Sequence, residues 1–152
     1  MQAAKAGDPG AQVLVAKSYC CSKKVAPTGT HNNRQATGWA CKAAAQGSAD
    51  AQALLGDIYS GEAVHNYGLV GLAASAFSSP DARPVVAAAW YSLAAQSAGS
   101  AQSGAAKKAQ KLREAFNSEE ASRYAAWMAA PETLPCEWDA AFSTPAPVAA
   151  GD

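Results

Sequence analysis

The chain of 152 residues repeats part of its own sequence at an offset of 40 positions. Residues 3–19 read AAKAGDPGAQVLVAKSY, and residues 43–59 read AAAQGSADAQALLGDIY. Seven of these seventeen positions are identical, and the identities include glycine, glutamine, leucine and tyrosine as well as alanine. A period near 40 that is built from helix pairs is typical of stacked helical arrays, so this offset restricts the possible folds strongly.

A second sequence element also recurs. Residues 38–47 read GWACKAAAQG, and residues 89–99 read AWYSLAAQSAG. In both, a tryptophan (Trp39 or Trp90) is followed by a pair of alanines and then by glycine, which stands where the end of a helix needs a left-handed residue. The repeating unit is therefore expected to be a helix that ends in tyrosine, a loop, and a helix that carries tryptophan.

The composition favours closely packed helices. Alanine, which is small and the best helix former, makes up about a quarter of the chain, whereas the β-branched residues valine and isoleucine are few. Capping residues and prolines then predict helices over 9–20, 34–46, 49–60, 84–98, 101–115 and 119–130. Residues 131–152, which include four prolines, are expected to form an irregular tail.

Charge and motifs exclude several classes of function. Twelve basic residues balance twelve acidic ones, so no overall field would attract nucleic acid. The longest apolar run, at 85–91, is too short to span a membrane. Catalytic sequence motifs are missing, and His31 and His65 lie in expected loops without ligand residues at metal-binding spacing. The sequence therefore predicts no enzyme, no catalytic residue, no metal and no cofactor.

One repeat family shares these motifs. The pattern Gly-x3-Ala-x2-Leu-x4-Tyr-x-Gly at 47–61, with Trp-x3-Ala-Ala-x2-Gly at 39–47, resembles the Sel1-like repeat, a relative of the tetratricopeptide repeats. The resemblance extends over about residues 1–130. It implies an all-α fold, a short α-solenoid of about three antiparallel helix pairs with a closing helix. The third unit departs from the pattern, because the connection at 61–83 is long and lacks the Leu-x4-Tyr stretch.

The first residues match the end of a repeat. MQAAKAG at the start is similar to CKAAAQG at 41–47. The chain is therefore expected either to begin with an abrupt N-terminal cap or to continue from upstream sequence, such as a signal peptide.

Aromatic residues at repeating positions are expected to fill the space between paired helices, where alanine lets the backbones approach. These expected core residues are Tyr19, Trp39, Tyr59, Trp90 and Tyr91.

The four cysteines leave two interpretations open. Cys20 ends one expected helix and Cys41 lies near the start of its antiparallel partner, so a Cys20–Cys41 disulfide is possible. Alternatively, all four are reduced thiols that pack as small hydrophobic groups. A bridge between Cys21 and Cys136 would require the tail to fold back.

The resemblance implies a non-catalytic protein–protein interaction module. Small periplasmic members of the Sel1-like family include immunity proteins that block a cognate secreted toxin of lipase type, which is the function we expect first. Other members are adaptors in signalling or envelope assembly, and cysteine-rich relatives are associated with binding of penicillin-like β-lactams. A periplasmic or exported location is expected, with a cytoplasmic one left open.

Two apolar segments outside the repeats are candidates for partner contact. Both the connection at 61–83 and the segment CEWDAAF at 136–142 carry aromatic side chains, which either pack on the array or face a partner. The residues expected to contact a partner are Asp57, His65, Tyr67, Arg83 and Trp138.

Overall fold

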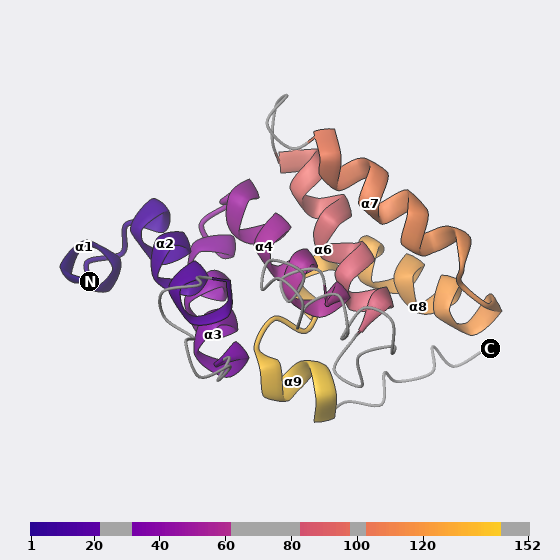
Figure 1. The fold of residues 1–152 in the computed structure, drawn as a ribbon. Helices are drawn as coiled ribbons and strands as arrows, with labels where there is room; N and C mark the ends of the chain where they lie inside the picture. Colours follow the sequence, from indigo (N-terminus) through magenta and orange to yellow (C-terminus); the bar gives the residue numbers. More distant parts are fainter. Residues whose placement is uncertain (22–31, 62–82, 98–102, 144–152) are drawn as a thin grey trace, which may run out of the picture.

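The computed structural model describes residues 1–21, 32–61, 83–97 and 103–143 (Figure 1). These residues form eight α-helices and one short 3-10 helix. In chain order they are α1 (Gln2–Lys5), α2 (Pro9–Cys20), α3 (Asn33–Ala44), α4 (Ala49–Ser60), α6 (Pro84–Ser97), α7 (Ser103–Glu114), α8 (Ser118–Ala129), η3 (Pro131–Thr133) and α9 (Trp138–Ser143).

From α1 to α7, helices that are neighbours in sequence pack against each other in antiparallel orientation, and α8 packs against α6. The helix α1 lies at one end of the molecule, and α7 and α8 lie at the other (Figure 1). The expected all-α class is confirmed. The helices α2 and α4 begin and end at the predicted residues, and α3, α6, α7 and α8 lie within one or two residues of the predicted bounds.

The sequence repeat is also a structural repeat. Each of α2 and α4 has twelve residues and begins at a polar N-cap, where Asp8 accepts a hydrogen bond from the backbone N–H of Ala11 and Ser48 accepts one from that of Ala51. Before each cap stands a glycine with a left-handed backbone, at φ +102° for Gly7 and +83° for Gly47. The glycines therefore end the preceding helix as the sequence predicts.

The connections between paired helices end in the same way although their lengths differ. The backbone N–H of Asn32 donates to the carbonyl of Tyr19 at 3.3 Å, and that of Arg83 donates to the carbonyl of Tyr59 at 2.6 Å. In both pairs the second helix thus starts beside the end of the first. As a result, α3 and α6 occupy equivalent places in the pairs α2–α3 and α4–α6.

Alanines and a few aromatic side chains form the core. Many core alanines are fully buried on the contacting faces of α2, α3, α4 and α6. Three of the five expected core aromatics, Tyr59, Trp90 and Tyr91, are buried. The other two, Tyr19 and Trp39, are half-buried and pack against the core.

A close contact between α4 and α6 depends on Gly56. A Cβ atom at this position would lie 2.5 Å from two ring carbons of Tyr91, which is fully enclosed. We expect Gly56→Ala to lower the free energy of unfolding by about 1–3 kcal/mol, because the overlap outweighs the gain in helix propensity. Urea unfolding measures the change.

Gly38→Ala is the matched control within α3, since no atom lies within 4 Å of the added Cβ. It should stabilise the protein by up to about 1 kcal/mol. Equal effects of the two substitutions would contradict the contact between Gly56 and Tyr91.

The C-terminal region differs from the irregular tail expected at 131–152. Its described part contains η3 and α9, and Leu134 and Ala141 are buried in the same core as the preceding helices. Residues 131–143 therefore fold back onto the helical array.

Candidate functional site

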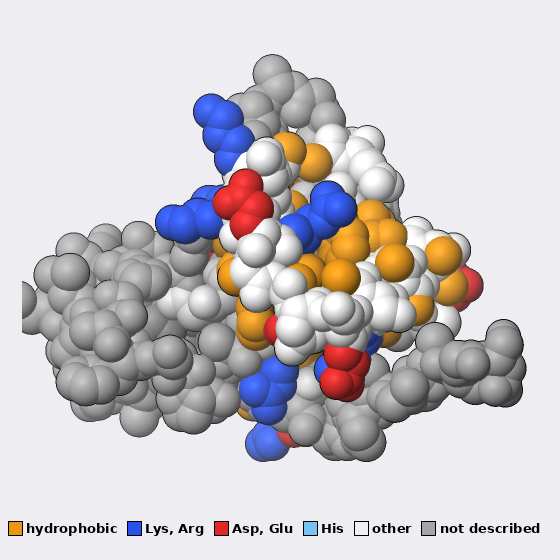
Figure 2. Space-filling model, turned by 90° about the vertical axis from the view of Figure 1, so that its right-hand side faces the viewer, with side chains coloured by type: hydrophobic (Ala, Val, Ile, Leu, Met, Phe, Trp, Pro, Cys, Tyr) orange, Lys and Arg blue, Asp and Glu red, His pale blue; other side chains and the backbone are white. Residues whose placement is uncertain are grey.

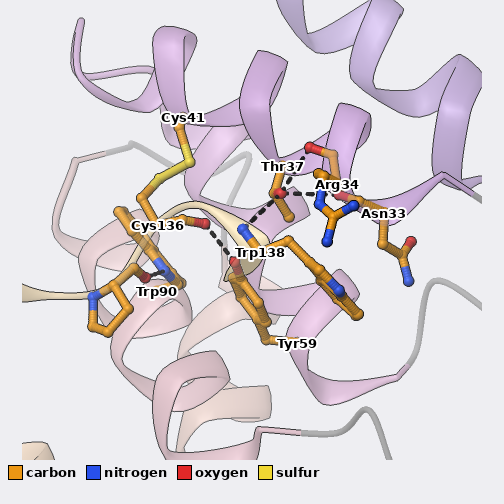
Figure 3. Close-up of a disulfide and its surroundings, with 9 residues drawn as sticks. Asn33, Arg34, Thr37, Cys41, Tyr59, Trp90, Cys136 and Trp138 are labelled. Carbon is orange, nitrogen blue, oxygen red and sulfur yellow. Dashed lines mark hydrogen bonds between the residues drawn. A yellow bond between two sulfur atoms is a disulfide. The ribbon is translucent and has the colours of Figure 1, made fainter. Parts of the chain in front are cut away.

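Residues 134–141, here called the docked segment, lie on a face formed by α3, α4 and α6 (Figure 3). One side chain from each helix bonds to the segment's backbone. The indole N–H of Trp90 donates to the carbonyl of Pro135 at 3.1 Å, and the hydroxyl of Tyr59 donates to the carbonyl of Cys136. The backbone N–H of Trp138 donates to the hydroxyl of Thr37 at 3.1 Å. Three helices thus satisfy three backbone groups of a segment distant in sequence.

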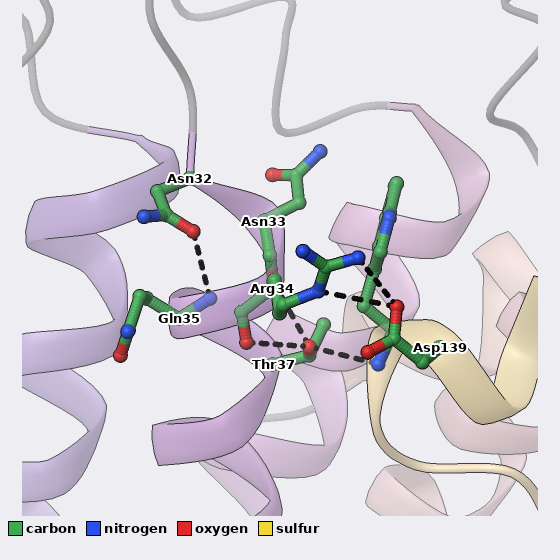
Figure 4. Close-up of polar contacts among 7 residues, drawn as sticks. Asn32, Asn33, Arg34, Gln35, Thr37 and Asp139 are labelled. Carbon is green, nitrogen blue, oxygen red and sulfur yellow. Dashed lines mark hydrogen bonds and ion pairs between the residues drawn. The ribbon is translucent and has the colours of Figure 1, made fainter.

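Two side chains of the docked segment add contacts of a different kind. The ring of Trp138 stacks on that of Tyr59, with 6.0 Å between the centroids and 13° between the planes. The carboxylate of Asp139 accepts hydrogen bonds from Nε and Nη2 of Arg34 at 3.1 and 2.7 Å (Figure 4). These bonds, together with the nearby negative charge, raise the pKa of Arg34. Because both side chains of the ion pair are about 70 % exposed, solvent screens the pair strongly.

The docked segment is also attached covalently. Cys136 forms a disulfide with Cys41 of α3, with 5.8 Å between the Cα atoms (Figure 3). The adjacent residues Cys20 and Cys21 form a second disulfide. The described residues therefore contain no free cysteine.

These pairings contradict the possible Cys20–Cys41 disulfide. Cys20 ends α2 beside the start of α3, where Asn32 bonds to Tyr19. Cys41 lies two turns further on, about 12 Å along the helix axis from Asn33. The prediction was wrong because it placed Cys41 too close to the start of its helix. The condition that the tail folds back is met, but Cys136 bonds to Cys41 and not to Cys21.

Tyr59 makes two contacts with the docked segment, a hydrogen bond from its hydroxyl to the carbonyl of Cys136 and the stacking on Trp138. Its side chain, which belongs to α4, is fully buried. This burial raises the pKa of Tyr59 well above the usual range.

The raised pKa predicts a loss of stability in alkali. Below about pH 10, Tyr59 is protonated in both the folded and the unfolded chain and contributes no pH dependence. Above this pH the unfolded state binds fewer protons, so the free energy of unfolding should fall as the pH rises. Urea unfolding at pH 9 and pH 11 measures the fall, which should be smaller in Tyr59→Phe. An equal fall in both chains would contradict the prediction.

Asp57, one of the expected partner contacts, belongs to a separate polar cluster between α4, α6 and α7. Its carboxylate accepts hydrogen bonds from the hydroxyl of Tyr91 at 2.5 Å and from the ammonium of Lys108 at 3.0 Å. The Tyr91 hydroxyl also lies 3.1 Å from the hydroxyl of Ser60. This cluster joins the second helix pair to α7, so the described contacts of Asp57 are made within the chain.

Of the other expected contact residues, the structure describes Arg83 and Trp138. Arg83 is half-buried at the start of α6, and Trp138 is half-buried on Tyr59. His65 and Tyr67 lie outside the described residues. Sequence reasoning missed Arg34, Thr37 and the Cys41–Cys136 pair, although the apolar character of 136–142 had indicated either packing on the array or partner contact.

The surface over α7 and α8 carries hydrophobic side chains among charged ones (Figure 2). An open pocket of about 550 Å³ lies there. Its lining includes Arg113, Phe116 and Tyr124, and the guanidinium of Arg113 lies over the ring of Tyr124 at 4.6 Å. No residue of α8 is buried.

Comparison with protein-family models, curated proteins and solved structures finds no match to this chain. Among the helices in the described residues, none has both the length and the hydropathy needed to cross a bilayer. The Cys41–Cys136 disulfide is consistent with an oxidising compartment.

Proposed function

We propose that the protein is a non-catalytic protein–protein interaction module of the Sel1-like, α-solenoid type, and that the face formed by α3, α4 and α6 binds a segment of a partner protein. The supporting observation is the docked segment itself, whose backbone is hydrogen-bonded by Thr37, Tyr59 and Trp90. Backbone hydrogen bonds do not depend on the identity of the bound side chains, so a segment of another protein can make them equally well.

The repeated helix pairs support the α-solenoid part of this proposal. Two features recur in successive helix pairs, as they would in a stacked array. These are the N-caps at Asp8 and Ser48 and the backbone hydrogen bonds to the carbonyls of Tyr19 and Tyr59. The partner we propose first is a secreted effector enzyme, which the protein inhibits when the Cys41–Cys136 bond is open. An adaptor in envelope or signalling assembly is the alternative within the same class.

The test is a comparative capture of partners from extracts of the source organism. One bait is the oxidised wild-type chain. The other, here called the opened chain, is the full chain with Cys41→Ala, Cys136→Ala, Trp138→Ala and Asp139→Ala, which removes the disulfide, the stacking on Tyr59 and the ion pair with Arg34. We expect one stoichiometric protein on the opened chain, identified by mass spectrometry, and much less of it on the wild type.

Two further substitutions in the opened chain test the face itself. Arg34→Glu should weaken capture, whereas Gln35→Glu on the same helix should not, because Gln35 points away from Asp139 (Figure 4). Inhibition of a captured enzyme would support the immunity function, and several proteins at low stoichiometry would favour an adaptor. Capture that Arg34→Glu leaves unchanged would contradict the proposed face.

A further inference from the structure

The contacts of the docked segment indicate which partner sequences the face would accept. The hydrogen bonds to Pro135, Cys136 and Trp138 all involve backbone atoms and therefore set no side-chain preference. Besides the buried apolar side chains of Leu134 and Ala141, two contacts can give selectivity: the stacking of Trp138 on Tyr59 and the ion pair between Asp139 and Arg34.

The two residues of the docked segment that make these contacts, Trp138 and Asp139, are adjacent in sequence. Tyr59 offers a buried aromatic ring, on which a planar side chain stacks favourably. Arg34 offers a forked guanidinium, which matches a carboxylate. A segment with an aromatic residue followed directly by an acidic one satisfies both at once.

We propose that the face formed by α3, α4 and α6 is a binding site for a partner segment in which an aromatic residue is followed by a carboxylate, and that the docked segment is an internal competitor for this site. The proposal rests on the proposed function and names the chemistry of its partner. In the docked segment, Trp138 and Asp139 form this pair of side chains.

The Cys41–Cys136 disulfide determines whether the docked segment or a partner segment occupies the face. While Cys41 and Cys136 are bonded, the docked segment stays next to the face and excludes a partner. A dithiol reductant opens this bond: it gives up two electrons and two protons, becomes a cyclic disulfide, and leaves two cysteine thiols. The only covalent attachment of the segment is then the chain through η3, which gives it an effective concentration of about millimolar that a partner can overcome.

The experiment measures the fluorescence anisotropy of a labelled peptide of residues 131–143 with Cys136→Ala. It is titrated with three full chains: the oxidised wild type, the wild type in dithiothreitol, and the opened chain. We expect the opened chain to bind with the highest affinity, the reduced wild type to bind less tightly, and the oxidised wild type to bind at least about a hundred-fold more weakly than the opened chain.

Variants of both components test the chemistry. A control peptide that also carries Trp138→Ala and Asp139→Ala should bind about ten-fold or more weakly. Arg34→Glu in the opened chain should weaken binding of the original peptide and should allow binding of a peptide with Asp139→Lys. Gln35→Glu should leave the binding of both peptides unchanged. Circular dichroism of each chain establishes that it is folded, and where the opened chain is not, the reduced wild type takes its place.

Three results would overturn the proposal. Equal binding to the oxidised wild type would place the peptide elsewhere, and would also count against the proposed face. Equal binding of the control peptide would refute the aromatic–acidic preference while leaving the proposed function intact. A dimer formed by exchange of the docked segment between two copies, seen by light scattering in place of peptide binding, would show that the occupant is a second copy of this chain.

Discussion

Replacing both Cys41 and Cys136 by alanine is expected to lower the free energy of unfolding by about 4 kcal/mol. The two cysteines are 95 positions apart, so their bond restricts most of the chain in the unfolded state. Loss of the bond increases the conformational entropy of the unfolded chain far more than that of the folded one, where the docked segment keeps its other contacts. Urea unfolding of the variant and the oxidised wild type measures the difference, and the denaturant slope should rise because the unfolded chain expands.

The second disulfide provides the control for this prediction. Cys20 and Cys21 are neighbours in sequence, so their bond closes almost no loop and restricts the unfolded chain very little. Replacing both by alanine should cost about 1 kcal/mol, chiefly through the packing of the buried Cys20. Comparable losses in the two double variants would show that loop closure is not what makes the Cys41–Cys136 bond stabilising.

Tyr59→Ala is expected to lower the free energy of unfolding by about 3–5 kcal/mol. The substitution removes a fully buried aromatic ring from the core, together with its stacking on Trp138 and its hydrogen bond to the carbonyl of Cys136. Urea unfolding with the disulfides intact measures the loss. Tyr59→Phe isolates the hydroxyl and should cost about 1 kcal/mol, because it leaves a part-buried carbonyl without its partner.

Tyr19→Ala is the matched control, since Tyr19 holds the equivalent position 40 residues earlier. It is only half-buried, and among the described residues no docked segment covers it. Its replacement should therefore cost about half as much or less, in proportion to the smaller area that leaves water. If the two tyrosines proved equally important, the docked segment would contribute little to the stability of the fold.

The helical frame could be predicted from sequence because its signals are local. The caps at Asp8 and Ser48 and the glycines at 7 and 47 lie next to the helices they delimit, and the 40-residue offset places them twice. The predicted bounds of α2 and α4 therefore match the structure, and those of α3 differ by one residue at its start and two at its end.

The docked segment could not be placed in the same way. Its contacts join Pro135, Cys136 and Trp138 to residues between 45 and 101 positions earlier, and no short pattern encodes such pairings. The prolines around it indicate an irregular chain, which is locally reasonable, but they carry no information on what the segment packs against. The true partner of Cys41 could not be predicted for the same reason, because the Cys41–Cys136 pairing requires the three-dimensional position of the tail.

The backbone hydrogen bonds to the carbonyls of Tyr19 and Tyr59 fix where the next helix begins, whatever the length of the connection before it. Twelve residues lie between Tyr19 and Asn32 and twenty-three between Tyr59 and Arg83, yet both end on the equivalent carbonyl. Doubling a flexible loop costs only about 0.6 kcal/mol of closure entropy. The carbonyl of Tyr59 thus marks a point at which evolution or an engineer can exchange one insertion for another, so that a single scaffold can display unrelated sequences without redesign of its core.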